Sequence, residues 1–201
     1  TAIILDSASK INQAHLQNDS ATVQTKNSND TIKTKLEPTF NSSQPSKDSL
    51  FFMKGLYFKS LNKFDSAKYY FEQSIKYGSL KSPIVLSLMY SDGTVATPKN
   101  INIAIKILEP AVKKGSVSAM INLGSLYEEK YECNKALNLF VSASKLGNTL
   151  EKKIAYTRLG SLYQNGGVDF PINLDFAKKY YVQACSLGDK DACRRLEELG
   201  K

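Results

Sequence analysis

The chain has 201 residues, of which 42% are hydrophobic, and a formal net charge of +8 at pH 7. This balance suits a folded protein that meets an acidic partner or an anionic surface. A membrane-spanning segment is excluded, because no apolar run reaches the roughly 18 residues that a bilayer requires. The basic residues are scattered singly or in pairs rather than gathered along one stripe, so we expect no nucleic-acid partner.

Residues 1–47 differ in composition from the rest of the chain. They contain one aromatic side chain, Phe40, and are rich in Ser, Thr, Asn, Gln and Lys, so we expect a polar, largely flexible N-terminal arm with a candidate short helix at Ser7–Gln17. Residues 48–201 are expected to form the single folded domain. The chain begins at Thr1 rather than Met, and we interpret it as a processed or trimmed product. A removed export signal, a lipid anchor on a removed or absent N-terminus, and simple trimming are the alternatives.

A packing skeleton recurs four times in the folded part. A small residue is followed seven positions later by a second small residue, and four positions after that by a glycine. Residues seven apart share a helix face, where small side chains let another helix approach closely, and the glycine suits the left-handed position that ends a helix. The sequence therefore predicts a stack of helices built from one repeated unit. The copies are Ala67–Ser74–Gly78, Ala104–Ala111–Gly115, Ala136–Ala143–Gly147 and Ala177–Ala184–Gly188.

A first helix precedes each skeleton helix and completes a helix pair. Its mark is Leu-Gly-x-x-Tyr, seen at Leu123–Tyr127 and Leu159–Tyr163, with Ser87 in place of the glycine in pair two and a looser match at Gly55. The tiny residue permits tight contact with another helix. The predicted pairs cover about 48–78, 79–115, 116–147 and 148–188, followed by a capping helix over 189–201.

Loops and caps agree with this division. The tiny residue and the first skeleton alanine lie 12 positions apart in pairs one and three and 17 apart in pairs two and four. Ser82, followed by Pro83, and Ser116 are predicted N-caps of first helices, and Asn100 and Asn173 of second helices.

These residues carry a resemblance to a known family. The run from Ala155 through Leu159-Gly160, Tyr163, Gly166-Gly167 and Ala177 to Gly188 resembles a Sel1-like repeat, a relative of the tetratricopeptide repeat with a longer loop within the helix pair. Pair two resembles it less closely, and pairs one and three look closer to ordinary tetratricopeptide repeats. The resemblance implies an all-α fold: a right-handed α/α superhelical solenoid of four helix-turn-helix repeats plus a C-terminal capping helix. It implies binding of proteins in general but no particular partner.

Cys185 and Cys193 add a finer resemblance. Cysteine-rich Sel1-like proteins of bacteria have a pair with this spacing of seven intervening residues, bridging neighbouring helices. The resemblance implies a disulfide and an oxidising compartment, periplasmic or secreted. Two buried thiols in helix packing are the alternative, which Cys133 favours because it has no partner in the sequence.

A binding groove follows from the same family, in which the first helices line the concave face. The N-terminal half of the groove is expected to be apolar and the C-terminal half polar, although the apolar members have the alternative of packing between helices. An apolar segment of the arm, Ala2–Leu5, is a candidate occupant of this groove or of a neighbouring molecule's groove. The groove positions are Phe52, Leu56, Lys59, Ile84, Leu88, Ser91, Ile121, Ser125, Glu128, Thr157, Ser161 and Gln164.

Catalytic and metal chemistry find little support. The sole histidine, His15, lies in the arm, and there is no Cys-x-x-Cys pair, so we expect neither a metal nor a cofactor. Ser-x-x-Lys occurs at Ser7, Ser60 and Ser142, as chance supplies in a chain rich in both residues, and no Lys-Thr-Gly accompanies it.

The sequence thus favours a non-enzymatic, exported bacterial protein that holds another protein or peptide. Three alternatives remain open: an immunity or accessory protein for a secreted toxin, a penicillin- or cell-wall-peptide-processing enzyme acting through Ser60 or Ser142, and a cytoplasmic signalling adaptor.

Overall fold

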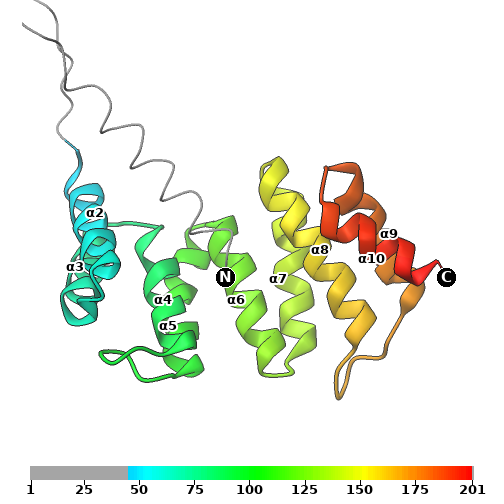
Figure 1. The fold of residues 1–201 in the computed structure, drawn as a ribbon, viewed down its shortest axis with the longest axis horizontal. Helices are drawn as coiled ribbons and strands as arrows, with labels where there is room; N and C mark the ends of the chain where they lie inside the picture. The colour runs from blue at the N-terminus through cyan, green and yellow to red at the C-terminus, as the bar shows by residue number, and fades with distance from the viewer. Residues whose placement is uncertain (1–44, 201) are drawn as a thin grey trace, which may run out of the picture. The chain divides into compact units, whose positions relative to one another are not determined.

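The structure is a computed structural model, and it describes residues 45–200. The predictions for the arm, including the helix at Ser7–Gln17, the site of His15 and the docking of Ala2–Leu5, lie outside the described residues. Within residues 45–200 there are nine α-helices and no β-strand, as Figure 1 shows. The helices are α2 (Lys47–Ser60), α3 (Phe64–Lys76), α4 (Ser82–Asp92), α5 (Ile101–Lys113), α6 (Val117–Glu129), α7 (Cys133–Leu146), α8 (Thr149–Asn165), α9 (Leu174–Ser186) and α10 (Lys190–Leu199).

The helices pack as antiparallel pairs in chain order. α2 packs on α3, α4 on α5, α6 on α7 and α8 on α9, while α6 also contacts the first helices on either side, α4 and α8. In Figure 1 the loops inside the pairs lie along the lower edge of the stack, and the linkers between successive pairs lie along the upper edge. Each pair therefore meets only its neighbours, which is the arrangement of a solenoid.

The predicted small-residue skeleton forms the centre of the stack. All eight of its alanine and serine positions are buried, each with at most 1% of its surface exposed. Ser74 is the one polar member, and its hydroxyl donates a hydrogen bond of 2.7 Å to the carbonyl oxygen of Asp48 in α2. A buried hydroxyl with a partner avoids the penalty of an unsatisfied polar group, so serine substitutes for alanine there without loss.

The small residue of each first helix faces an aromatic ring of the second helix in three of the four pairs. An added Cβ would lie 2.5 or 2.6 Å from the nearest ring carbon of Phe71 at Gly55, of Phe140 at Gly124 and of Tyr181 at Gly160. No side chain fits that distance, so glycine is required there by the close approach of the ring. In pair two the corresponding residues are Ser87 and Leu108, both buried.

Three of the four predicted N-caps are confirmed. The side chains of Asn100, Ser116 and Asn173 each accept a hydrogen bond from a backbone N–H in the first turn of the helix that follows. Ser82 was wrongly predicted as a cap, because α4 begins at Ser82 itself and Lys81 takes the N-cap position without a side-chain hydrogen bond. The hydroxyl of Ser79 instead accepts from the N–H of Ser82, at 3.2 Å.

The predicted left-handed glycines are confirmed in three copies of the skeleton. Gly78, Gly115 and Gly188 have φ of 96°, 82° and 82°. Gly147 was wrongly predicted, since its φ of −71° is extended. The reason lies in the next residue: Asn148 caps α8 directly, and together with Glu151 it forms a capping box, so the linker is too short for a left-handed turn.

The capping helix α10 closes the stack. Ala192 is fully buried against α9, and Leu196 and Leu199 pack beside it on the cluster formed by Ala177 and Tyr181. The opposite face of α10 is polar, with Arg194, Glu197 and Glu198 exposed. A terminal helix of this kind lets a solenoid end in water.

Candidate functional site

The N-terminal groove positions lie partly within the packing of the first pairs. Phe52 and Leu56 are half-buried and pack against the core cluster that contains Phe71 and Met89, with 6.0 Å between the ring centroids of Phe52 and Phe71. Lys59 is half-buried at the end of the same helix. This part of the surface is therefore apolar but only partly open.

The central groove positions divide into closed and open ones. Ile121 is buried, with 8% of its surface exposed, in a cluster with Ala143 and Ala155. Ser91 is buried too, and its hydroxyl donates to the carbonyl oxygen of Leu88 at 3.1 Å. Ile84 and Leu88 remain half-buried. Among the predicted groove positions on α4, Ile84 and Leu88 are thus the partly open ones.

The polar groove positions are mostly occupied by hydrogen bonds within the chain. The hydroxyl of Ser125 donates to the carbonyl oxygen of Ile121, and Ser161 accepts a hydrogen bond from the amide of Asn165. The Oε1 atom of Gln164 accepts from the hydroxyl of Tyr181 at 2.6 Å. These side chains therefore hold hydrogen bonds that fix the local structure.

Glu128 stands apart from the other polar groove positions. It is half-buried near the C-terminal end of α6, and burial raises the pKa of its carboxyl group, an effect that the nearby guanidinium of Arg158 only partly offsets. Burial disfavours the charged form of this carboxyl group, and a cation supplied by a partner would stabilise that form.

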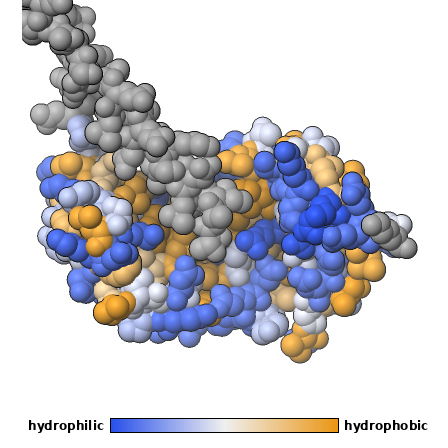
Figure 2. Space-filling view, in the orientation of Figure 1, coloured by the Kyte–Doolittle hydropathy of each residue, from blue (hydrophilic) through white to orange (hydrophobic). Residues whose placement is uncertain are grey.

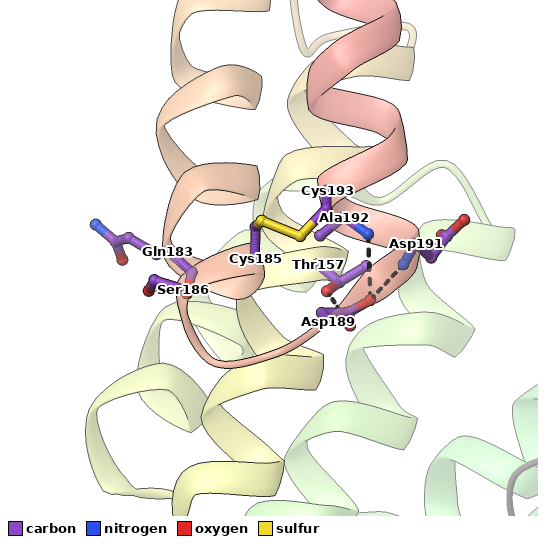
Figure 3. The surroundings of a disulfide bond; sticks show 8 residues. All are labelled: Thr157, Gln183, Cys185, Ser186, Asp189, Asp191, Ala192 and Cys193. Carbon is purple, nitrogen blue, oxygen red and sulfur yellow. Dashed lines mark hydrogen bonds between the residues drawn. A yellow bond between two sulfur atoms is a disulfide. The ribbon is translucent and has the colours of Figure 1, made fainter.

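The C-terminal end of the stack is locked by a disulfide, as the sequence resemblance implied. Cys185 at the end of α9 and Cys193 in α10 are bonded, with 4.8 Å between their Cα atoms. Figure 3 shows the turn between them and the carboxylate of Asp189, which accepts hydrogen bonds from the backbone N–H groups of Asp191 and Ala192 and from the hydroxyl of Thr157. Asp189 therefore caps α10 and ties it to α8, so the predicted groove residue Thr157 also has a structural contact.

The third cysteine is enclosed. Cys133 has 5% of its surface exposed, and burial raises the pKa of its thiol, with a further contribution from the charge of Glu128. An added Cβ at Gly167 would lie 2.4 Å from the sulfur of Cys133, so the α8–α9 loop covers the thiol directly. A buried thiol with a raised pKa is a poor nucleophile.

The serines of the two described Ser-x-x-Lys motifs donate hydrogen bonds within their own helices. The hydroxyl of Ser60 donates to the carbonyl oxygen of Tyr57 at 2.7 Å, and that of Ser142 donates to the carbonyl oxygen of Asn138 at 2.8 Å. Within residues 45–200 no group of three or more His, Cys, Asp or Glu side chains is gathered that could hold a metal ion. The same part of the chain has no helix long and apolar enough to cross a membrane.

An aromatic face on the first pair was missed. The rings of Tyr77, Phe51, Tyr70 and Phe58 stack in series, with 5.4, 6.2 and 5.1 Å between successive centroids. The ammonium groups of Lys47 and Lys54 lie over the rings of Tyr77 and Tyr70. The density of aromatic residues between positions 51 and 77 was the available signal, but which rings face each other depends on how α2 meets α3.

Exposed apolar loop tips were also missed. Val95 and Val168 occupy equivalent places in the two long loops, with 94% and 85% of their surface exposed, and Tyr131 in a short loop has 72% exposed. Figure 2 shows apolar surface at the projecting α8–α9 loop, beside hydrophilic surface along the same edge. The matching glycines of the long loops predicted a turn, but they carry no information on which side chain would project.

A shallow hollow of about 410 Å³ lies between α5 and the α6–α7 loop. Glu132 forms ion pairs with Lys135 at 2.6 Å and Lys130 at 3.0 Å, and these hydrogen bonds lower the pKa of Glu132. The ammonium group of Lys135 lies 5.1 Å from the centroid of the Tyr127 ring. Lys106 and Glu109 also line the hollow and form no ion pair among residues 45–200, so its charges are only partly paired.

Several solved structures resemble this chain, among them the following three. The crystal structure of a Sel1 repeat protein from Oxalobacter formigenes aligns with a TM-score of 0.60 and 20% identity, over 76% of this chain and 63% of that one. Two weaker likenesses are c5321, a protective antigen present in uropathogenic Escherichia coli strains displaying an SLR fold, and a protein from Klebsiella pneumoniae subsp. pneumoniae described as a Sel1 repeat protein. Their TM-scores are 0.47 and 0.41, their identities 17% and 15%, and they cover 75% and 78% of this chain and 41% and 94% of their own lengths.

The likeness to the Oxalobacter protein shows the fold, a right-handed α/α superhelical solenoid, as the sequence predicted. No curated protein sequence matches the chain. A family model described as the Sel1 repeat matches residues 85–116, 117–148 and 153–189. The family model therefore matches pair three, whose loop is short, in addition to pairs two and four, whose loops are long. Because the three matched repeats cover about half of the chain and lie on successive helix pairs of the solenoid, the chain belongs to the Sel1 repeat family.

Proposed function

We propose that this chain is a non-enzymatic scaffold that holds another protein or a peptide in the groove lined by its first helices. The observation that carries the proposal is Glu128, a half-buried carboxylate with a raised pKa on the central first helix. Such a group is unfavourable for the free chain and becomes favourable when a partner supplies a positive charge.

The residues around Glu128 indicate which other side chains the partner carries. The half-buried Ile84, Leu88 and Leu56, on the helices before α6, offer apolar surface, and Ser161, on α8 after it, adds a polar side chain. A ligand that fits this order carries apolar side chains followed by a lysine or arginine. An extended or helical peptide presents side chains in such a row.

The test uses labelled synthetic peptides of roughly ten residues in which an apolar half is followed by one Lys or Arg. We expect Glu128→Gln to weaken binding about 10-fold to 100-fold, as for loss of a charge-assisted contact, and Leu88→Asp to abolish it. Glu109→Gln and Val182→Asp are matched controls, because these residues are exposed on second helices. Fluorescence anisotropy measures the affinities. Equal losses in the controls, or no dependence on the basic residue, would contradict the proposal.

The pH dependence of binding gives a second readout of the same contact. The pKa of Glu128 is raised in the free chain, and a bound cation lowers it, so the affinity is complete above the free-chain pKa and falls as the pH drops through it. The fall should begin at a higher pH than an ordinary exposed glutamate would give. In Glu128→Gln the same pH range should leave the affinity unchanged.

We also propose that the protein is exported, as the resemblance to bacterial cysteine-rich Sel1-like proteins implies. The Cys185–Cys193 bond supports this, because disulfides persist in oxidising compartments and are rare in the cytosol. The disulfide therefore favours an exported protein over the alternative of a cytoplasmic signalling adaptor. A thiol count on the native protein tests the proposal: one thiol per chain after unfolding supports it, and three would contradict it.

A further inference from the structure

Positive charge gathers on the linkers between successive helix pairs. We call residues 76–81, 113–116 and 145–150 the turn edge; they are the first three linkers along the upper edge in Figure 1, together with the helix ends beside them. These residues include no Asp or Glu. Five of them are exposed lysines: Lys76, Lys81, Lys113, Lys114 and Lys145.

Within residues 45–200 no carboxylate pairs with these lysines. The ion pairs that Lys99, Lys130 and Lys135 make with glutamates all lie at the opposite edge, around the loops inside the pairs. Among residues 45–200 none of the five turn-edge lysines forms an ion pair. Glu151, just beyond the last linker, is occupied: it completes the capping box of α8 and accepts a hydrogen bond from Ser118.

Helix stability explains only part of the pattern. Lys76, Lys113 and Lys145 lie in the last turns of α3, α5 and α7, where a positive charge interacts favourably with the helix dipole. Lys81 has the reverse placement, at the N-cap of α4, where the dipole disfavours a cation and a Ser or Asp would cap the helix. The surplus of lysine at these turns therefore points to something outside the chain.

Apolar side chains project between the lysines. Leu146 and Leu150 have 65% and 55% of their surface exposed, and Tyr77 and Leu80 have 46% and 37%. We propose that the turn edge binds the surface of an anionic lipid bilayer, with the lysines at the lipid phosphates and the leucines among the upper parts of the acyl chains. This combination of basic and apolar side chains is typical of peripheral membrane contacts.

A lipid surface fits these residues better than a nucleic acid or an acidic protein. Exposed leucines gain nothing from a phosphate backbone but gain from entry into the boundary of the acyl chains. The lysines also lie in or beside three separate linkers along one edge, and a flat partner can reach several of them at once. The groove proposed above is lined by the first helices, so it has no residue in common with the turn edge.

The test measures sedimentation of the full chain with vesicles at about 50 mM and about 500 mM NaCl. One set of vesicles contains phosphatidylcholine with about 30% phosphatidylglycerol, and the other contains phosphatidylcholine alone. We expect binding to the anionic vesicles only, weakened at high salt. Replacing Lys113 and Lys114 by Gln should weaken it about fivefold for each lysine. Leu146→Ser with Leu150→Ser should weaken it roughly tenfold and remove the binding that persists at high salt.

Matched controls separate this site from general charge. Lys99→Gln with Lys135→Gln removes the same charge from the opposite edge and should leave vesicle binding unchanged, and circular dichroism should show that all variants are folded. Equal losses from the two lysine pairs would overturn the proposal. So would an absence of vesicle binding, or binding of a DNA duplex or an acidic peptide through Lys113 and Lys114 without vesicle binding.

Discussion

A glycine against an aromatic ring is the contact on which three of the helix pairs depend. Gly124 and Phe140 are one example, in which a Cβ at position 124 would lie 2.5 Å from the ring. Small residues at these places were predicted from the sequence, but the ring that requires them was not. The signal was present: position four after the first skeleton alanine is aromatic wherever the small residue is glycine, and is Leu108 where it is Ser87.

Replacing Gly124 by Ala should destabilise the protein although alanine has the higher helix propensity. The added methyl group forces Phe140 or α6 to move, and overpacking of this kind costs about 1–3 kcal/mol, against a propensity gain of about 1 kcal/mol. The double change Gly124→Ser with Phe140→Leu imitates pair two and should recover part of the loss. Urea unfolding measures the free energies, and Ser125→Ala in the same helix is the control. A Gly124→Ala variant as stable as the parent would show that the ring can move freely.

The loops inside the pairs reverse the direction of the chain between two helices, and the short and long loops use different left-handed residues to do so. The short loops place Asn62 and Tyr131 in the left-handed region, with φ of 57° and 61°, and the long loops place Gly93 and Gly166 there, with φ of 80° and 64°. The two loop lengths and the glycines of the long loops were predicted from the sequence. The left-handed residues of the short loops were not, because asparagine only mildly indicates this conformation and tyrosine argues against it.

Tyr131 should therefore be a site where a substitution stabilises the protein. Tyrosine in the left-handed region is strained, and asparagine tolerates it, so Tyr131→Asn should raise the free energy of unfolding by about 0.5–1 kcal/mol. The reciprocal change Asn62→Tyr should lower it by a similar amount. Both are measured by urea unfolding at equal protein concentration. If Tyr131→Asn lowers stability, the exposed ring makes a contact that outweighs the strain.

The stack as a whole was predictable because the contacts in a solenoid join helices that are near one another in the sequence. Each pair meets only its neighbours, so the spacing of Ala104, Ala111 and their counterparts was enough to predict the order and packing of the helices. The groove was less predictable. Whether Ile121 or Ser91 is open depends on the neighbouring repeats, and the hydrogen bond of Thr157 to Asp189 joins residues 32 positions apart.

Locality also determines what the disulfide can stabilise. Its short loop, with a sequence separation of 8, should contribute roughly 2–3 kcal/mol, and this contribution should stay at the C-terminal end. We expect Cys185→Ala with Cys193→Ala to speed amide hydrogen exchange in α10 and the end of α9, while α4 to α6 remain protected. Reduction of the parent protein should reproduce the pattern. Faster exchange throughout the helices would mean that the stack unfolds as one unit.

The polar outer face of α10 has a consequence for assembly. The two ends of a solenoid are different surfaces, so contact between the end of one chain and the start of the next would repeat without closing and would produce a filament. Arg194, Glu197 and Glu198 leave no apolar surface on that face for a second chain to stack upon. We expect the polar outer face of α10, a helix of ten residues, to disfavour the stacking of a second chain upon it.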